Sequence, residues 1–386
     1  MRIKSKLIEL FKRTISYNKN TSVYENGDSN DYPERIERLI NNSVTAKQCA
    51  NTMAVFLAGK GFGDNNSFEV SDGVTLLKLT HKASQSTSRQ RGIFFHVNYN
   101  LNYEIASLDV LPFSHCRVGK KDDDKYNGKI GVCEDWTDHK KSGVKWINVY
   151  NSNKKVIKAQ IDKCKGDTDV DKLDNYKGQV LFISLDNDTI YPYSTIDAVQ
   201  NDCDSEAQAS IYKNVSLRKG FFGKTIVITR PLLTAKPEDD DYKEQKDELT
   251  AFQGSMKDFM GAENADGILH LQLEFDDDEK IEKAIKFEKI ETNINDKLFA
   301  FTENSVFNNI LFAFNNLPKI LARSSEGNMF GNSGELIKQA KIFYQDQTTM
   351  ERMVVIDTIK MLMQKFSGFK GELTHEPLIK IEDAVS

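Results

Sequence analysis

The sequence contains few cysteines, and their spacing is not that of cysteines that bind a metal ion. Five are present, Cys49, Cys116, Cys133, Cys164 and Cys203, with no Cys-x-x-Cys pair and no histidine at ligand spacing from a cysteine. Structural zinc sites use cysteine and histidine pairs at short spacing, so no zinc site is expected. An odd number of scattered cysteines is typical of a reducing compartment and predicts a cytoplasmic protein.

Long apolar runs and an excess of positive charge are also missing. No stretch reaches the roughly 20 apolar residues that a membrane-spanning helix needs, and the segment Met1–Leu7 interrupts its apolar residues with charges, unlike a signal peptide. We expect no membrane association. Lys and Arg number 52 against 57 Asp and Glu, a net charge of -5. This balance excludes a wholesale basic nucleic-acid binder that gains affinity by counterion release.

Catalytic and metal-binding motifs are absent from the sequence. The six histidines form no His-Glu-x-x-His motif, and no Gly-x-Ser-x-Gly phrase occurs. The run Gly59-Lys60-Gly61-Phe62-Gly63-Asp64 lacks Walker spacing and follows a predicted helix, which indicates a helix-ending turn. The aspartate runs at 122–124, 239–241 and 276–278 lack the alternating oxygens of an EF-hand. We predict a protein that is not an enzyme and has no cofactor and no metal.

The first half of the chain changes from helical to strand-like patterning. Residues 18–31 are polar and predict a mobile arm, and residues 33–57 predict a helix that begins near Pro33. From 91 to 190 the apolar residues recur as in strands, which predicts an antiparallel sheet and an α+β fold. The expected strands are 93–99, 105–111, 129–132, 146–150, 156–159 and 180–184.

The stretch 195–275 predicts a helix, a short strand, a second helix and a second strand. The first helix, 195–219, has a narrow apolar stripe, and the second, 242–260, follows the acidic loop 237–241. The strands are 225–229 and 267–275. A narrow stripe suits a helix whose neighbours are copies of itself, and an ordinary helical hairpin on its own core is the alternative. The stripe of the first helix is Ile196, Val199, Cys203, Ala207, Ile211 and Val215.

Charge and apolar patterning continue to change after residue 275. The segment 276–291 alternates lysines with acidic residues, which predicts a solvated helix face. Residues 297–315 predict an apolar helix that Pro318 ends. Residues 334–366 predict one long helix, and 373–381 predict a last strand.

Several phrases, in order, resemble the portal proteins of tailed double-stranded-DNA bacteriophages, of the HK97-like type. Lys219-Gly220-Phe221-Phe222-Gly223 stands where the family has a phrase with Asn-Gly, which is altered here, and Gly261 to Gly267 (GAENADG) matches a family turn closely. Phe314 to Pro318 and Asn328 to Glu335 match later phrases, so the resemblance covers about residues 30 to 370.

The resemblance implies a portal-type protomer with a mixed wing, a helical stem, a small β-containing clip and a helical crown. Its expected parts are an N-terminal arm (1–32), the wing (33–192 and 262–330), stem helices (193–219 and 243–261), the clip (220–242) and the crown (331–386). It also implies a homo-oligomeric ring, usually twelvefold, at one capsid vertex of the virion, assembled in the host cytoplasm. Double-stranded DNA would pass through the ring during packaging and ejection, without sequence specificity.

The resemblance also implies partners and site residues. The partners are the terminase large subunit, a head-completion or adaptor protein, and the major capsid or scaffold protein. The expected channel lining is Lys280, Lys283, Lys286, Lys289, Asn293 and Asn295. The expected docking surface of the clip is Lys224, Arg230, Lys236, Glu238, Asp239 and Asp240.

Two other functions remain open from the sequence. One is a virion connector or scaffold component that binds capsid proteins without forming a DNA channel. The other, favoured less, is a cytoplasmic enzyme that acts on nucleic acid. A ring with an open bore would separate the portal from the connector, and a nuclease or nucleotide-hydrolysis activity that is lost on mutation of one acidic cluster would favour the enzyme.

Overall fold

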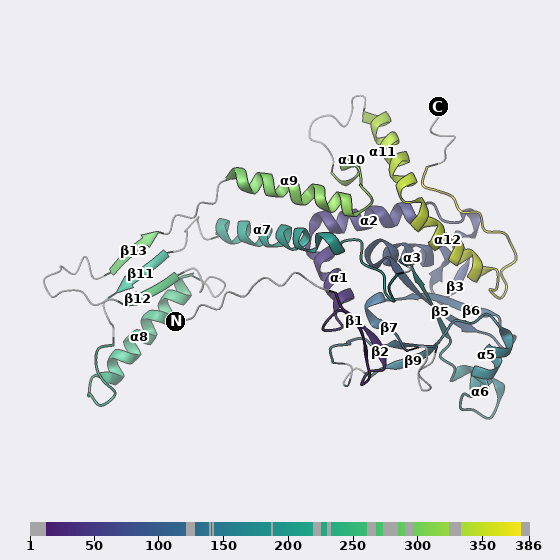
Figure 1. The fold of residues 1–386 in the computed structure, drawn as a ribbon, viewed down its shortest axis with the longest axis horizontal. Helices are drawn as coiled ribbons and strands as arrows, with labels where there is room; N and C mark the ends of the chain where they lie inside the picture. The colour runs from purple at the N-terminus through teal and green to yellow at the C-terminus, as the bar shows by residue number, and fades with distance from the viewer. Residues whose placement is uncertain are drawn as a thin grey trace. The chain divides into compact units, whose positions relative to one another are not determined.

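The structure, a computed structural model, describes residues 13–120, 128–138, 140, 143–186, 188–218, 225–229, 233–260, 268–272, 285–289, 296–323 and 333–379. The chain divides into two units (Figure 1). The first unit is Met1–Ala207 together with Ser305–Ser386, and the second is Gln208–Asn304.

A six-stranded sheet forms the centre of the first unit, in the order β6-β5-β10-β9-β8-β7. Every neighbouring pair is antiparallel except β9 and β10. β5 is buried on both faces, because Phe95 and Val97 belong to one apolar cluster and Phe94 to another. The strands are β5 (Gly92–Tyr99), β6 (Ile105–Leu111), β7 (Cys116–Val118), β8 (Lys129–Val132), β9 (Lys145–Val149) and β10 (Gln179–Ser184).

Helices cover one face of this sheet and add a second apolar cluster beside it. α3 (Leu76–Gln90) and α12 (Thr349–Met363) contribute buried residues such as Leu79 and Ile359 to the cluster that contains Phe95. The second cluster joins α1 (Tyr32–Asn42) and α2 (Val44–Ala58) to Cys203, Ile310 and Tyr344, which come from distant parts of the chain. The smaller elements of the unit are β3 (Glu69–Ser71), β4 (Val74–Thr75), α5 (Lys154–Ile161), α6 (Asp169–Asp174), α10 (Lys319–Ala322) and α11 (Ser333–Gln347).

A hairpin near the N-terminus is fixed to the sheet by one buried arginine. β1 (Ile15–Asn18) pairs with β2 (Val23–Asn26), and Val23 bridges Gly119 beyond the edge strand β7. The Arg117 side chain has no exposure and donates to Asn30 Oδ1 at 2.6 Å and to the Asn30 carbonyl at 2.6 Å. The prediction of a mobile arm over residues 18–31 is therefore wrong, because the buried Arg117 guanidinium binds Asn30 in that segment.

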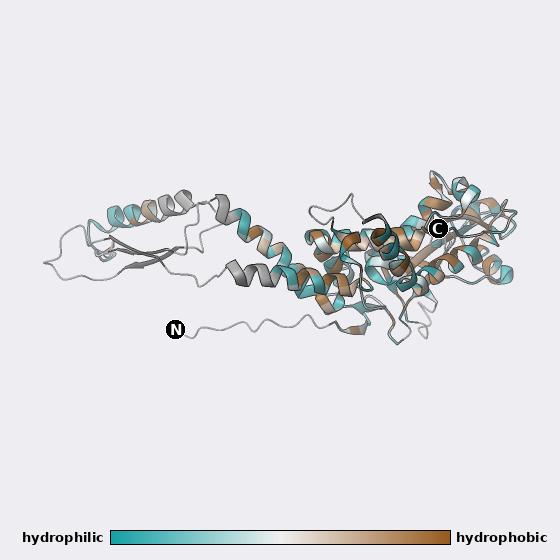
Figure 2. Cartoon of the chain, turned by 90° about the horizontal axis from the view of Figure 1, so that it is seen from above, coloured by the Kyte–Doolittle hydropathy of each residue, from teal (hydrophilic) through white to brown (hydrophobic). Residues whose placement is uncertain are grey.

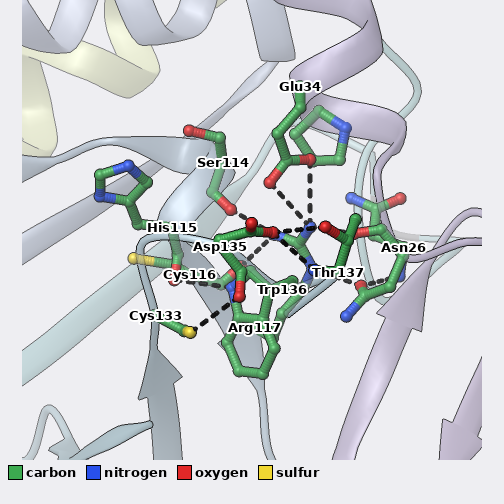
Figure 3. A network of polar contacts seen from close by, with 12 residues as sticks. Asn26, Glu34, Ser114, His115, Cys116, Arg117, Cys133, Asp135, Trp136 and Thr137 are labelled. Atoms are coloured by element: carbon green, nitrogen blue, oxygen red, sulfur yellow. Dashed lines mark hydrogen bonds and ion pairs between the residues drawn. The ribbon is translucent and has the colours of Figure 1, made fainter. Parts of the chain in front are cut away.

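Other polar groups complete the Arg117 environment (Figure 3). The guanidinium donates to the carbonyls of Ser114 at 2.7 Å and Cys116 at 3.0 Å, and it lies 3.3 Å from a Glu34 carboxylate oxygen. Its Cζ atom lies 5.5 Å from the centre of the Trp136 ring. Burial raises the pKa of Glu34, and the charge of Arg117 partly opposes this shift.

The second unit contains a small sheet in the order β12-β11-β13. β11 (Thr225–Thr229) and β12 (Ile268–Gln272) are parallel, and β13 (Ile285–Lys289) is antiparallel to β11. α8 (Tyr242–Met260) lies between β11 and β12 in the chain, so these three elements form a β-α-β unit. Parts of α7 (Gln200–Arg218) and α9 (Asp296–Ala313) belong to this unit as well.

The described elements confirm the predicted α+β class and correct several details. Residues 156–159 lie in α5, where Asn153 caps the helix and Ile157 and Ile161 are buried one turn apart, so the short apolar run was wrongly assigned to a strand. The helix predicted over 33–57 breaks at Ser43, which is extended and caps α2. The long helix over 334–366 likewise breaks at Thr348.

Two further outcomes concern turns and the charged segment. The Gly59 turn ends α2 as predicted, and Gly59 and Gly61 both have positive φ angles. Lys60 N donates to the Glu376 carbonyl at 2.8 Å, so this turn holds the C-terminal segment rather than a phosphate. Of the charged segment 276–291, residues 285–289 form strand β13 and not a solvated helix face, because they pair with β11.

Candidate functional site

Helix α7 is rooted in the first unit by a polar cap as well as by apolar contacts. Cys203 is fully buried among residues of α1 and α2. Three residues on, the Glu206 carboxylate accepts hydrogen bonds from the Ser43 hydroxyl, from the Thr45 hydroxyl at 2.7 Å and from Thr45 N at 3.3 Å. The carboxylate therefore lies at the N-terminus of α2, where free amide groups and the helix dipole favour negative charge.

The part of α7 beyond this root is exposed. The predicted stripe is buried at Cys203, but about two turns further on, Ile211 is 57% exposed. Gln208, Ser210 and Asn214 are exposed or nearly so as well. Within the protomer, the first part of the stripe is thus covered by the protein core and its continuation is not.

Helix α9 accompanies α7 in the opposite chain direction. In the first unit Asn309 Nδ2 donates to Asp202 Oδ1 at 3.2 Å, and in the second unit Lys213 forms an ion pair with Glu303. The order of these contacts makes the two helices antiparallel. In the later part of α9, Ile310 and Leu311 are buried, whereas Phe312 is 66% exposed. Helix α7 therefore contacts α9 as well as α1 and α2, whereas the helix expected beside it in the stem was 243–261.

The loop before α8 is ordered by its own polar groups. Gln245 Oε1 accepts from Thr234 N at 2.9 Å and from Ala235 N at 3.0 Å, which joins the loop to the first turn of α8. Lys236 N donates to Asp239 Oδ2 at 2.7 Å. The aspartates and the glutamate of 237–241 are exposed, so this loop presents a strongly acidic surface. Hydrophilic residues predominate in the described part of α8 (Figure 2).

Four of the predicted docking residues lie on this loop. Lys236, Glu238, Asp239 and Asp240 are all exposed just before α8. Of the predicted channel residues, Lys286 and Lys289 lie in β13, opposite Ile228 and Thr225 of β11. The other predicted site residues, Lys224, Arg230, Lys280, Lys283, Asn293 and Asn295, lie outside the described residues. Their roles stay predictions.

Sequence reasoning missed two features of this site. It did not pair α7 with α9, because no local pattern states which helix contacts which. It also did not single out Glu206, because an acidic residue three positions after a buried cysteine is an ordinary pattern on a helix surface. The serine-threonine phrase at Ser43 and Thr45 was the available signal for a capped helix start.

Within the described ranges, no group of three or more His, Cys, Asp or Glu side chains could hold a metal ion. Among the same residues, no helix combines the length and apolarity needed to cross a bilayer.

No protein-family model and no curated protein matches the chain. Among solved structures, it is similar to a chain of the virion of a native gene transfer agent particle, with 13% identity, a TM-score of 0.49, and 89% of this chain and 83% of that chain covered. It is similar to a chain of the neck of a native gene transfer agent particle computed with C12 symmetry, with 12% identity, a TM-score of 0.42, and coverages of 88% and 91%.

A third similar structure is an HK97 family phage portal protein from Corynebacterium diphtheriae, with 8% identity, a TM-score of 0.39, and coverages of 78% and 82%. This description names the same family as the sequence phrases. At these identities and TM-scores, the likenesses by themselves assign no function to the chain, and its own residues have to carry that argument.

Proposed function

We propose that this chain is the protomer of a phage portal ring, through which double-stranded DNA is packaged and ejected at one capsid vertex. The observation that carries the proposal is helix α7. Its stripe is buried at Cys203 and exposed at Ile211, and its further course leads into a small β-α-β unit. A helix with an uncovered stripe and a polar remainder is stabilised when copies of the same helix surround it.

The proposal changes the expected division of the chain. The stem consists of α7 and α9, because these two helices contact each other through Asp202 and Asn309 and through Lys213 and Glu303. The clip then extends from β11 through α8 to β13. The wing is the six-stranded sheet with α1, α2, α3 and α12, and α11 belongs to the crown region. The short clip predicted for 220–242 is replaced by this larger unit.

The acidic loop before α8 supports a docking role for the clip. Three carboxylates at 238–240 are exposed and lie within a segment held by Gln245. Such a surface attracts a basic patch on a partner and repels DNA. In this proposal the terminase large subunit binds the loop during packaging, and an adaptor protein replaces it. The capsid or scaffold protein contacts the wing, and the ring is part of the virion.

The test of the proposal is assembly. We expect the purified full-length protein to form rings with an open bore in negative-stain images, and a mass many times that of the 43.9 kDa protomer. Ile211→Asp places a charge on the exposed stripe and should reduce ring formation, while the fold of the protomer is kept, because the side chain is already half in water. Val170→Asp is the matched control, since Val170 is an exposed apolar residue of α6, at 52%, outside the stem.

Three outcomes would contradict the proposal. A strict monomer at all concentrations would refute the ring. A ring without a bore would favour the connector without a DNA channel. An equal effect of Ile211→Asp and Val170→Asp on assembly would remove the argument from the α7 stripe, since general loss of solubility would then explain both.

A further inference from the structure

A groove in the first unit is built where the chain leaves α12 and returns to the sheet. Ile105 N donates to the Lys365 carbonyl at 3.1 Å, and Ser367 N donates to the Ile105 carbonyl at 2.7 Å. These two bonds attach residues 365–367 alongside the start of β6. The resulting groove has a volume of about 570 Å³, which is the size of pockets that hold several side chains or a small ligand.

Hydrogen bonds cross-link the turn that forms one wall of the groove. The Asn100 side-chain oxygen accepts from Asn102 N at 2.9 Å and from Glu104 N at 3.0 Å, and its amide nitrogen donates to Ser367 Oγ at 3.0 Å. Tyr103 is held at a φ of +59°, a left-handed conformation that a bulky residue seldom adopts. A wall fixed in this way loses little conformational entropy when a ligand binds.

The floor and walls of the groove are mostly aromatic. Tyr103, Tyr150 and Phe369 line it and are partly exposed, whereas Tyr99 and Phe366 lie beneath them. Phe366 and Phe369 are themselves held by Phe68, at ring-centre distances of 5.6 and 5.2 Å. Partly exposed aromatic rings in a fixed concave surface are suited to hold a large apolar side chain of a partner.

Positive charge surrounds these rings. Lys154, Lys365 and Lys370 line the groove, and Glu104, the one acidic residue among the described residues that line it, already faces Lys154 at 3.7 Å. Lys365 Nζ lies 3.3 Å from the Tyr150 hydroxyl. An adjoining cavity of about 140 Å³ shares Gln364 and Phe369 and is lined by Lys360 and Glu372. The groove is therefore locally basic on a chain whose net charge is -5.

We propose that this groove binds an acidic peptide segment of a partner protein through one aromatic or branched apolar side chain. The rings take the apolar side chain, and Lys365 and Lys370 attract the flanking carboxylates. Charge complementarity favours an acidic partner, because the described lining has three lysines and one acidic residue, Glu104, which is already paired with Lys154. A nucleic-acid strand fits less well, because Glu104 and Glu372 interrupt the basic edge that its backbone would follow. The proposal does not depend on ring formation.

The test is fluorescence anisotropy with full-length protein and labelled peptides. The probe is fluorescein-EEDFLDEE, and the controls are EEDAADEE, which lacks the apolar side chains, and KKKFLKKK, which reverses the charge. We expect the probe to bind and each control peptide to bind at least tenfold more weakly. Binding of the probe should weaken as salt increases from 50 to 300 mM, because charges contribute to it.

Protein variants connect binding to the groove. Lys370→Glu, at an exposed position, should weaken binding of the probe by about fivefold or more, because it replaces one attractive charge contact with a repulsive one. Lys163→Glu makes the same charge change at an exposed residue outside the groove and should leave binding unchanged. Tyr103→Gly removes one ring and relieves the left-handed strain, which offsets part of the packing that the ring makes with the core cluster, so it should weaken binding more than it lowers thermal stability.

Three results would overturn the proposal. The first is no binding of the probe at protein concentrations up to about 1 mM, which corresponds to less than about 4 kcal/mol of binding free energy. The second is equal affinity in Lys370→Glu and Lys163→Glu, which would locate the binding elsewhere. The third is displacement of the probe by an equimolar dT12 oligonucleotide, which would make the groove a nucleic-acid site.

Discussion

Replacing Arg117 by methionine should destabilise the first unit severely. The guanidinium has no exposure and donates to three carbonyl oxygens and to the Asn30 side chain, besides its ion pair with Glu34. Methionine fills similar space but donates no hydrogen bond, so the carbonyls of Asn30, Ser114 and Cys116 would lose a buried donor and Glu34 its partner. Removal of one partner from a buried charge network costs about 3–5 kcal/mol.

The size of this loss should depend on pH. Burial already raises the pKa of Glu34, and without Arg117 that pKa rises further. A carboxyl group with a folded pKa above its unfolded value binds more protons in the folded state, so stability falls as pH rises through the interval between the two. The variant should therefore lose more stability at pH 7.5 than at pH 5.5, where protonation relieves the isolated carboxylate.

Urea unfolding followed by tryptophan fluorescence measures this loss, because Trp136 lies against the Arg117 guanidinium. Lys82→Met is the matched control: Lys82 pairs with Asp109 at 2.6 Å, but both side chains are more than a third exposed, so the expected loss is about 1 kcal/mol or less. A loss below about 1 kcal/mol in Arg117→Met, or one equal to that in Lys82→Met, would refute the view that Arg117 fixes the hairpin to the sheet.

Two other substitutions test polar contacts at the two ends of α2 in the first unit. Glu206→Ala removes the acceptor at the start of α2 and should lower the free energy of unfolding by about 1–2 kcal/mol, whereas Asp204→Ala, at an exposed position on the same helix, should change it by less than half as much. Burial lowers the pKa of His375, so the folded state favours the neutral ring that contacts the Ala58 carbonyl at 3.0 Å. Stability should fall as pH decreases below about 6.5, because the unfolded state then binds more protons. In His375→Gln, this part of the pH dependence should disappear. If urea unfolding gives the variant the same pH dependence of stability between pH 5 and 7 as the unsubstituted protein, His375 does not contribute to it.

Local patterns in the sequence were sufficient for most single elements. The α9 helix, the strands β5, β6, β10 and β11, and the turn at Gly59 lie where spacing and turn residues placed them. The same patterns failed for short runs, as in α5, where the four mostly apolar residues 156–159 fit a strand as well as one turn of helix. They failed again at Ser43, because a break within a continuous apolar stripe leaves the periodicity almost unchanged.

The sequence by itself determined the fold class and the stripe of α7, since both depend on residue spacing along one segment. Only the tertiary structure decided that α7 runs beside α9, that the 18–31 segment is fixed by Arg117, and that the end of α12 forms a basic aromatic groove. Each of these joins residues that are more than 80 positions apart in the chain. The energy of such contacts comes from burial and hydrogen bonds between distant groups, and spacing along the chain carries no record of which distant groups will meet.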